Sequence, residues 1–211
     1  MYLERVNRET RTRLTRKESQ EATRHRLIAS AIESFAQDGV AATSLNAVAE
    51  RAGYSRGAVH GNFDGKDALA AAVAESVVGA LGPELQRVLA VPEPSGDRLA
   101  AYIRTFLRYC TDHPHAVGAL IAVVEYFGRL DPQHYGERAA AALEDLVGLF
   151  EDGQRRGEMR AFDARIMAFA VRTVLDNAAL QLSGGRADAA ELTTEITALF
   201  ANATREERNP A

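Results

Sequence analysis

Apolar residues recur at helical spacing along almost the whole chain, and the helical stretches are separated by short segments that contain glycine or proline. This pattern predicts an all-α protein. The first expected helix carries Ile28, Ala31 and Phe35. The further expected helices span about 44–52, 55–62, 66–81, 97–112, 115–129, 132–156, 163–183 and 188–203. Gly82-Pro83 either ends the helix that starts at 66 or allows it to continue to Leu89.

The order of these helices predicts a small N-terminal domain followed by a larger helical domain. We expect a basic extension at 1–20, a three-helix domain at 21–66 and a larger domain at 67–211. The clearest linker is Val91 to Gly96, since two prolines and a glycine oppose regular structure. The helix that starts at 66 would connect the two domains.

Two short helices in the N-terminal domain are expected to meet at a tight turn. Thr43 or Ser44 can cap the first helix, and Gly53 can adopt the left-handed conformation that closes it. Ser55 then offers a new N-cap for the segment 55–62. Ala49 lies where the second helix would cross, and its small side chain allows close contact.

The segment 55–62 has two unlike faces. Val59 and Phe63 fall on one side of a helical wheel, and Gly57 and Gly61 fall on the opposite side. Each glycine costs about 1 kcal/mol relative to alanine inside a helix, so two on one exposed face favour close approach to another surface. The alternative is a weak surface helix that merely tolerates the glycines. The charged residues around them exclude a membrane helix.

In this order of features the segment resembles the DNA-binding region of the TetR family of one-component transcriptional regulators. The resemblance covers roughly 22–70 and includes Gly39, the Thr43-Ser44 cap, Ala49 with Gly53, Ser55-Arg56-Gly57, Phe63 and Lys66 with Leu69. It implies a helix-turn-helix domain whose recognition helix is 55–62. The implied DNA-contacting residues are Thr43, Ser44, Ser55, Arg56, Gly57, Ala58, His60, Gly61 and Lys66.

The chain departs from the family pattern at two of these positions. Family members usually carry tyrosine where this chain has His60, and often a bulky polar or aromatic residue where it has Gly61. Imidazole adds a positive charge only when it is protonated, near pH about 6.5 in the unperturbed group. A family operator sequence therefore does not carry over to this chain.

Charge is distributed unevenly along the 211 residues. The net charge is -4, yet residues 1–66 hold 11 Lys and Arg against 8 Asp and Glu, and the remainder holds 14 against 21. A basic head and an acidic body suit a protein that presents one end to phosphates. The first residues, with Arg5, Arg8, Arg11, Arg13, Arg16 and Lys17, form either a basic DNA-binding arm or a disordered tail.

Other sequence features limit the cellular location of the protein and the kinds of site that it can contain. The N-terminus lacks the apolar core of a secretory signal, and the longest apolar stretch, Ala116 to Val124, is too short to span a bilayer, so a soluble cytoplasmic protein without membrane contact is expected. Cys110 is the only cysteine, which excludes an internal disulfide and a cysteine-built zinc site and suggests core packing. His113, His115 and His134 suggest solvated loop residues rather than a metal site.

The last two expected helices are rich in apolar residues and predict a dimer. The same pair of helices from a second chain, 163–183 and 188–203, would complete a four-helix bundle as in the TetR family. The alternative is that these apolar residues pack inside one subunit.

The helices from 97 to 183 are expected to enclose a ligand pocket. Its candidate lining residues are Tyr102, Phe106, Tyr109, Tyr126, Phe127, Met167, Leu175 and Asn177, with Arg104, Glu125 and Asp176 as further polar candidates, although ordinary core packing is the commoner role of such aromatics. The sequence contains no phosphate-binding glycine loop after a strand and no nucleophile elbow, so no enzyme activity and no cofactor are expected.

Together these features predict a ligand-responsive repressor that binds an inverted-repeat operator as a homodimer and is released by a small-molecule effector. Two rivals stay open. One is a small-molecule binding protein whose DNA-binding head has decayed, with His60 and Gly61 as the symptoms. The other is an α-helical enzyme whose site the sequence does not indicate.

Overall fold

The computed structural model describes residues 15–130 and 143–206. All regular elements in these ranges are helices, which confirms the predicted all-α class. They are α1 (Arg16–Ala42), α2 (Leu45–Arg51), α3 (Arg56–His60), α4 (Lys66–Leu89), α5 (Ser95–Asp112), α6 (Pro114–Leu130), α8 (Glu144–Arg155), α9 (Ala164–Ser183) and α10 (Ala189–Thr204). Of the helix expected at 132–156, the part at 132–142 lies outside the described residues.

Helix α1 begins earlier than the sequence analysis expected. Thr15 is its N-cap and forms a capping box with Glu18: the Glu18 amide donates to the Thr15 hydroxyl at 3.2 Å, and the Thr15 amide donates to the Glu18 carboxylate at 2.7 Å. The extension predicted for 1–20 is therefore wrong at its end, since the residues from Arg16 onward are helical. Residues 1–14 lie outside the described part of the chain. Near its other end α1 kinks at Gly39, whose φ is 76°.

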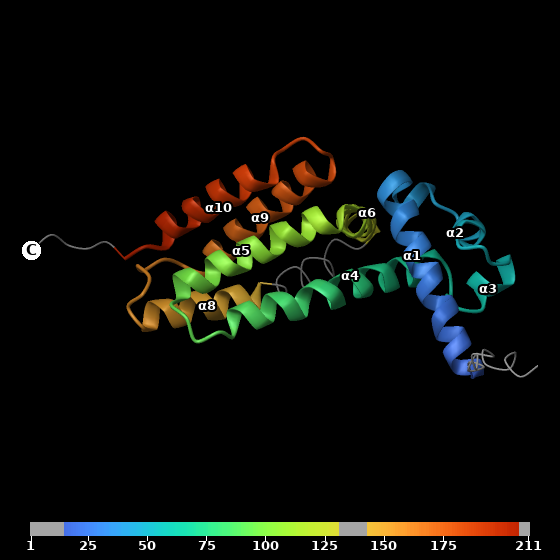
Figure 1. Ribbon diagram of the computed structural model, residues 1–211, viewed down its shortest axis with the longest axis horizontal. Helices are drawn as coiled ribbons and strands as arrows, with labels where there is room; N and C mark the ends of the chain where they lie inside the picture. Colours follow the sequence, from blue (N-terminus) through green and yellow to red (C-terminus); the bar gives the residue numbers. More distant parts are fainter. Residues whose placement is uncertain (1–14, 131–142, 207–211) are drawn as a thin grey trace, which may run out of the picture.

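Helix α4 runs through Gly82 and Pro83 to Leu89, so the expected end near 81 was too early, and of the two alternatives at Gly82-Pro83 the structure has the continuation. It joins two hydrophobic clusters. Leu69 and Val73 belong to the cluster under α1–α3, and Leu81 and Leu85 belong to the cluster of the larger domain. Figure 1 shows this long helix passing from the three-helix head into the elongated body.

By length and composition α4 could cross a membrane, with a mean hydropathy of 1.4 over its most apolar window, and it is the only such helix in the described ranges. Charged and polar residues interrupt its apolar positions, so a search for unbroken apolar runs does not reveal it. Seven of its residues are buried against other helices. Core helices of water-soluble domains often have the same length and composition.

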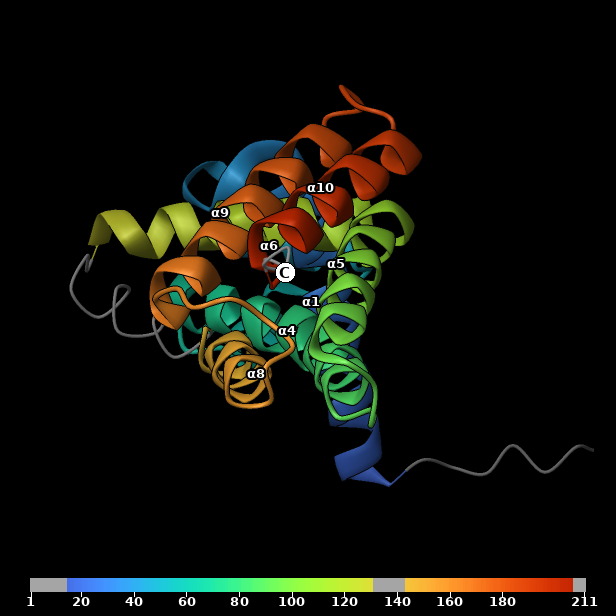
Figure 2. The ribbon, with the colours of Figure 1, turned by 90° about the vertical axis from the view of Figure 1, so that its left-hand side faces the viewer.

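The body consists of α5, α6, α8, α9 and α10 together with most of α4. Seen end-on, α9 and α10 lie on one side of α5 and α6, and α8 and α4 lie on the other (Figure 2). Leu99, Ile103 and Phe106 of α5 are buried in the centre of this arrangement. Cys110 lies in the same core, as expected, and burial raises the pKa of its thiol to about 12.

Helix α6 connects the body to the head. Ala119 and Val123 of α6 are buried in the same cluster as Phe35 of α1. The absence of a side chain at Gly118 permits this packing, because a Cβ atom there would lie only 3.3 Å from the Cβ of Ala36. The head and the body therefore share one interface, built by α1, α4 and α6.

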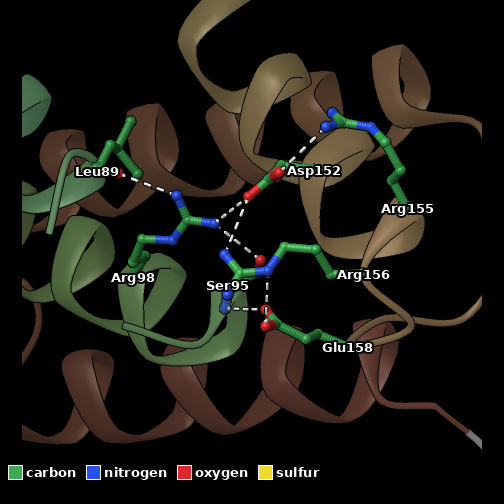
Figure 3. A network of polar contacts seen from close by, with 7 residues as sticks. All are labelled: Leu89, Ser95, Arg98, Asp152, Arg155, Arg156 and Glu158. Atoms are coloured by element: carbon green, nitrogen blue, oxygen red, sulfur yellow. Dashed lines mark hydrogen bonds and ion pairs between the residues drawn. The ribbon is translucent and has the colours of Figure 1, made fainter. Parts of the chain in front are cut away.

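A polar network ties the opposite end of the body together (Figure 3). Arg98 of α5 donates to Asp152 of α8 at 2.7 Å and to the Ser95 hydroxyl at 2.9 Å. Arg156 pairs with Asp152 at 3.4 Å and with Glu158 at 3.1 Å. Glu158 in turn accepts a hydrogen bond from the Ser95 amide at 2.7 Å. The start of α5 and the end of α8 are thereby held in one geometry.

Candidate nucleic-acid interface

The expected helix-turn-helix is present and its turn has the predicted construction. Ser44 is the N-cap of α2 and accepts a 3.1 Å hydrogen bond from the Ala47 amide. Gly53 has a φ of 75°, the left-handed conformation that lets the chain leave α2. Ala49 is 1% exposed at the crossing of the two helices. Ala49 therefore allows the close helix crossing, and Gly53 forms the turn, as predicted from the sequence.

Helix α3 is anchored by one face and leaves the other open. Val59 and Phe63 are buried, and Arg56, Gly57, His60 and Gly61 are exposed. The helix is shorter than the predicted 55–62, because Gly61 is already the C-cap, and a turn follows in which the amides of Asn62 and Phe63 donate to the Val59 carbonyl. Ser55 is the N-cap as expected, but its side chain makes no capping hydrogen bond. The predicted separation of the two faces is confirmed.

The glycine strip, Gly57 with Gly61, borders an open hollow of about 340 Å³ between α3 and the start of α1. We call this the α1–α3 hollow. Its lining residues are Arg16, Ser19, Gln20 and Thr23 of α1, and Gly57, Ala58, Gly61 and Asn62 at α3. Ala58, expected to flank the strip, is half-buried beside it. The bare strip thus faces an accessible space outside the subunit core.

Two predicted contact residues are engaged inside the protein. Thr43 is 5% exposed, and its hydroxyl donates to the Gly39 carbonyl at 2.8 Å, so the expectation that this hydroxyl reaches a DNA backbone is corrected. The hydroxyl stabilises the end of α1 instead. Lys66 donates from Nζ to the Ala41 carbonyl at 2.7 Å. One of its three donors is therefore used to join the start of α4 to the end of α1.

Arg24, which was not among the residues predicted from sequence, braces α3 against α1. Its guanidinium lies 4.4 Å from the centroid of the Phe63 ring and donates to the Asn62 carbonyl at 3.0 Å. Local periodicity gives no signal for a contact between residues so far apart in sequence. The Thr15-Glu18 capping box is a partial signal for this contact in the sequence. It places the start of α1 before Arg24, so that Arg24 lies on a helical face near α3.

The candidate ligand residues do not form one group. Tyr102, Phe106, Tyr109 and Leu175 are buried in the body core, and Met167 packs at its edge. Tyr126 and Phe127 pack against the cluster of the head instead, which corrects their assignment to a body pocket. Asn177 is exposed and donates to the Thr173 carbonyl within its own helix, so it does not point into the core either.

The polar candidates for the ligand site are at the surface. Arg104 is exposed, Glu125 pairs with Arg129 on the same helix, and Asp176 pairs with Arg172 at 2.8 Å. Arg172, not considered from the sequence, reaches inward with its guanidinium 5.2 Å from the centroid of the Phe106 ring. Burial raises the pKa of the neighbouring Tyr102 phenol, and the positive charge of Arg172 opposes that shift.

Histidines do not gather around a metal site in the described ranges, where no group of three or more His, Cys, Asp or Glu side chains is arranged to hold an ion. The His113 ring packs against Tyr109, with 4.6 Å between ring centroids. His134 lies outside the described residues.

Comparison with known proteins agrees with this geometry. Residues 27–73 match the profile of the bacterial regulatory proteins, tetR family. No curated protein matches the chain over its sequence. Among solved structures, a putative fatty acid metabolism regulator from Clostridium perfringens is similar with a TM-score of 0.71 and 15% identity, covering 86% of this chain and 100% of that one.

Two further structures have the same fold. A tetR-family regulatory protein from Rhodococcus RHA1 has a TM-score of 0.70 and 20% identity, covering 85% of this chain and 95% of its own. AibR, solved with isovaleryl coenzyme A and operator DNA, has a TM-score of 0.70 and 15% identity, covering 84% and 97%. The helix-turn-helix thus matches the profile of the tetR family of bacterial regulatory proteins, and the body has the same fold as these solved regulators.

Proposed function

We propose that the chain is a homodimeric repressor that binds an inverted-repeat DNA operator in the cytoplasm and leaves it when a small-molecule effector binds the body. The observation that carries this proposal is the glycine strip on the exposed face of α3. Gly57 lies inside so short a helix and weakens it by about 1 kcal/mol, whereas Gly61 is its C-cap. The cost at Gly57 is explained if the helix backbone must come close to a partner surface.

The residues around the strip suit a DNA major groove. Arg56 and His60 are both exposed beside the glycines. An arginine at the start of a recognition helix can donate to a guanine edge or to phosphate, and protonated imidazole can contact phosphate. Ser44 and Ser55, each at a helix start, are the proposed hydroxyl contacts to the DNA backbone.

The outer face of α9 and α10 supports a dimer. Ile166 is 69% exposed, Phe169 63% and Leu199 53%. Large apolar side chains exposed together mark an interaction surface. A second copy of the same two helices would cover them in a four-helix bundle. The resulting twofold axis would present two recognition helices at a separation of roughly 34 Å, one turn of DNA.

The body is the proposed effector-binding domain. The aromatic core around Tyr102, Phe106 and Tyr109 could open to admit an organic ligand. A complex of the similar protein AibR contains both an acyl coenzyme A and operator DNA, which supports a ligand-responsive role here.

Coupling would pass through α6 and α4, which contact the head and the body alike. An effector that binds better to a body conformation with displaced recognition helices lowers DNA affinity, and DNA lowers effector affinity by the same factor.

The test is the variant Gly61→Leu. A Cβ atom at Gly61 would lie 3.1 Å from the Gly57 carbonyl oxygen, so the local backbone needs only a small shift, while the new side chain fills the space in front of the strip. We expect operator binding in a mobility-shift assay to be abolished with helicity retained. Gly79→Leu on the exposed surface of α4, where a Cβ would meet no neighbour within 4 Å, is the matched control.

Retained binding by Gly61→Leu would contradict the close-approach argument. The rival function, a small-molecule binder without DNA affinity, predicts that specific duplex leaves the melting temperature of the wild-type protein unchanged. A DNA-binding regulator predicts a rise, since ligands of the folded state stabilise it by mass action.

A further inference from the structure

Two hollows of the same volume, about 340 Å³, lie in the head and differ in charge. The hollow between the end of α1 and α2 is lined by two acids, Asp38 and Glu50, with one base, Arg51. Among the described residues, the α1–α3 hollow is lined by Arg16 and by no acidic side chain. Its polarity therefore favours an anion, and that of its neighbour does not.

The acidic residues at the start of α1 turn away from the α1–α3 hollow. Glu18 is used in the capping box with Thr15, and Glu21 pairs with Lys17 at 3.9 Å. Neither carboxylate is among the lining residues. The wall formed by α1 thus presents one guanidinium together with the hydroxyl and amide groups of Ser19 and Gln20.

The opposite wall is open because of the glycines. A Cβ atom at Gly57 would have the Ser55 hydroxyl oxygen, 3.8 Å away, as its nearest neighbour, so the space in front of this residue is vacant. Arg24 fixes the separation of the two walls, since it extends from α1 and binds both the ring of Phe63 and the carbonyl of Asn62. The hollow is therefore preformed, and a ligand need not order its walls.

We propose that the α1–α3 hollow is a slot for one sugar-phosphate strand of the bound duplex, with Arg16, Ser19 and Gln20 of α1 as phosphate contacts. This rests on the proposed DNA binding and extends the interface from α3 to the first turns of α1. A phosphodiester is the anion that lies next to a recognition helix in a groove, and guanidinium, hydroxyl and amide groups are its usual partners. Contacts of this kind position the protein without selecting bases.

The first test measures the salt dependence of binding. The probe is a duplex selected from random sequences by repeated binding to the wild-type protein, and the dissociation constant is followed by fluorescence anisotropy from about 50 to 200 mM salt. We expect Arg16→Gln to reduce the slope of log K against log salt by about 0.9, the value for one phosphate. Its relative affinities for duplexes of different sequence should stay those of the wild type.

Lys17→Gln is the matched control, because Lys17 is the next residue on α1, carries the same charge and lies outside the lining of the hollow. We expect its slope to be unchanged. An equal reduction of the slope in Arg16→Gln and Lys17→Gln would show a general attraction of a basic segment to DNA. That result would overturn the proposal that the hollow binds a phosphate strand.

The second test places a negative charge in the slot. Ser19→Glu should weaken binding about tenfold at moderate salt, since it replaces a phosphate contact by repulsion. Ser76→Glu on the exposed side of α4 is the control and should bind as the wild type does. Circular dichroism checks that both variants fold.

The outcomes separate this proposal from the function on which it rests. A wild-type protein that enriches no duplex at all would overturn both. A wild-type protein that binds its selected duplex, with Arg16→Gln and Ser19→Glu equal to their controls, would overturn the slot alone and leave the α3 interface in place.

Discussion

The guanidinium of Arg24 lies 4.4 Å from the centroid of the Phe63 ring, and the same group donates to the carbonyl next to that ring at 3.0 Å. Phe63 is 3% exposed, so the stacked pair anchors the chain directly after α3 to the first third of α1. The orientation of the recognition helix thus depends on a contact that lies outside the helix-turn-helix itself.

We expect Arg24→Gln to lower stability by about 1 to 2 kcal/mol, the sum of a cation–π contact and a hydrogen bond, and to weaken DNA binding. Urea denaturation and anisotropy measure the two effects. Arg24→Lys is the control: lysine keeps the charge but lacks the planar fork that stacks and donates together. If Arg24 positions α3, lysine fails to rescue DNA binding. Rescue by lysine would mean that Arg24 acts as a charge on phosphate instead.

Gly57→Ala should raise the stability of the head and lower its affinity for DNA. Alanine is the better helix former, so the head should gain up to about 1 kcal/mol, and the space in front of Gly57 admits the methyl group without a clash. DNA affinity should nevertheless fall, because the methyl group holds the helix away from the groove. Gly79→Ala, in the middle of α4, should give a comparable gain with unchanged affinity. Equal affinity in both variants would contradict a functional role for the strip.

Phe169→Glu should dissociate the dimer. Phe169 is 63% exposed on α9, and a carboxylate at that place would be buried without a partner in the proposed bundle. Size-exclusion chromatography with light scattering should give a monomer, and operator affinity should fall because two linked half-sites are lost. Val78→Glu is the control, since Val78 is 54% exposed on α4, away from that face. A wild-type protein that is already monomeric would contradict the dimer.

The head was more predictable from sequence than the body because its signals are local. The Ser44 cap, the left-handed Gly53 and the buried pair Val59 and Phe63 each depend on residues a few positions apart. Helix periodicity and capping preferences report such relationships directly. Asp163 and Asp188 cap α9 and α10 by the same kind of local contact, each accepting a hydrogen bond from the amide of the third residue beyond it.

Features that depend on contacts between distant helices could not be predicted in this way. Tyr126 and Phe127 have the periodicity of core residues, but periodicity does not say which core, and they pack against the head. The inward position of Arg172 and the brace formed by Arg24 depend on how whole helices cross. Thr43 illustrates a third limit, because a hydroxyl at a helix boundary can bond to either neighbouring helix, and here it bonds to α1.

Tyr126→Phe tests the link between α6 and the first turn of α4. The Tyr126 hydroxyl donates to Asp67 at 2.7 Å, and this hydrogen bond, more than burial, raises the pKa of the phenol above its usual value near 10. The folded state thus favours the neutral phenol. Its contribution to stability is complete below the unfolded pKa and is lost as the pH rises through the raised one.

We expect Tyr126→Phe to cost at most about 1 kcal/mol at neutral pH, because the pair is exposed to water. Urea denaturation of the two proteins at neutral pH and near pH 11 measures the difference, which should shrink at the higher pH. A difference that is absent at neutral pH, or equally large at both, would contradict a stabilising hydrogen bond between these helices.

The polar network of Arg98, Asp152, Arg156 and Glu158 should make the stability of the protein depend on pH in the acidic range. The hydrogen bond from Arg98 lowers the pKa of Asp152, with Arg156 adding to the shift, and the Ser95 amide lowers the pKa of Glu158. For carboxyls with lowered pKa values, the stabilisation is present above the unfolded values near about 4 and disappears as the pH falls through the folded ones. Thermal denaturation should therefore show a melting temperature that declines between about pH 5 and pH 3.

Asp152→Asn should melt lower than the wild type at neutral pH and decline less steeply in acid, because Arg98, whose side chain is 13% exposed, loses its charged partner at every pH. Glu195→Gln, an exposed carboxylate on α10, is the control and should follow the wild-type curve. If Asp152→Asn and the wild type declined in parallel, the acid sensitivity would have to come from other carboxylates. The network would then contribute packing but no charge-dependent stability.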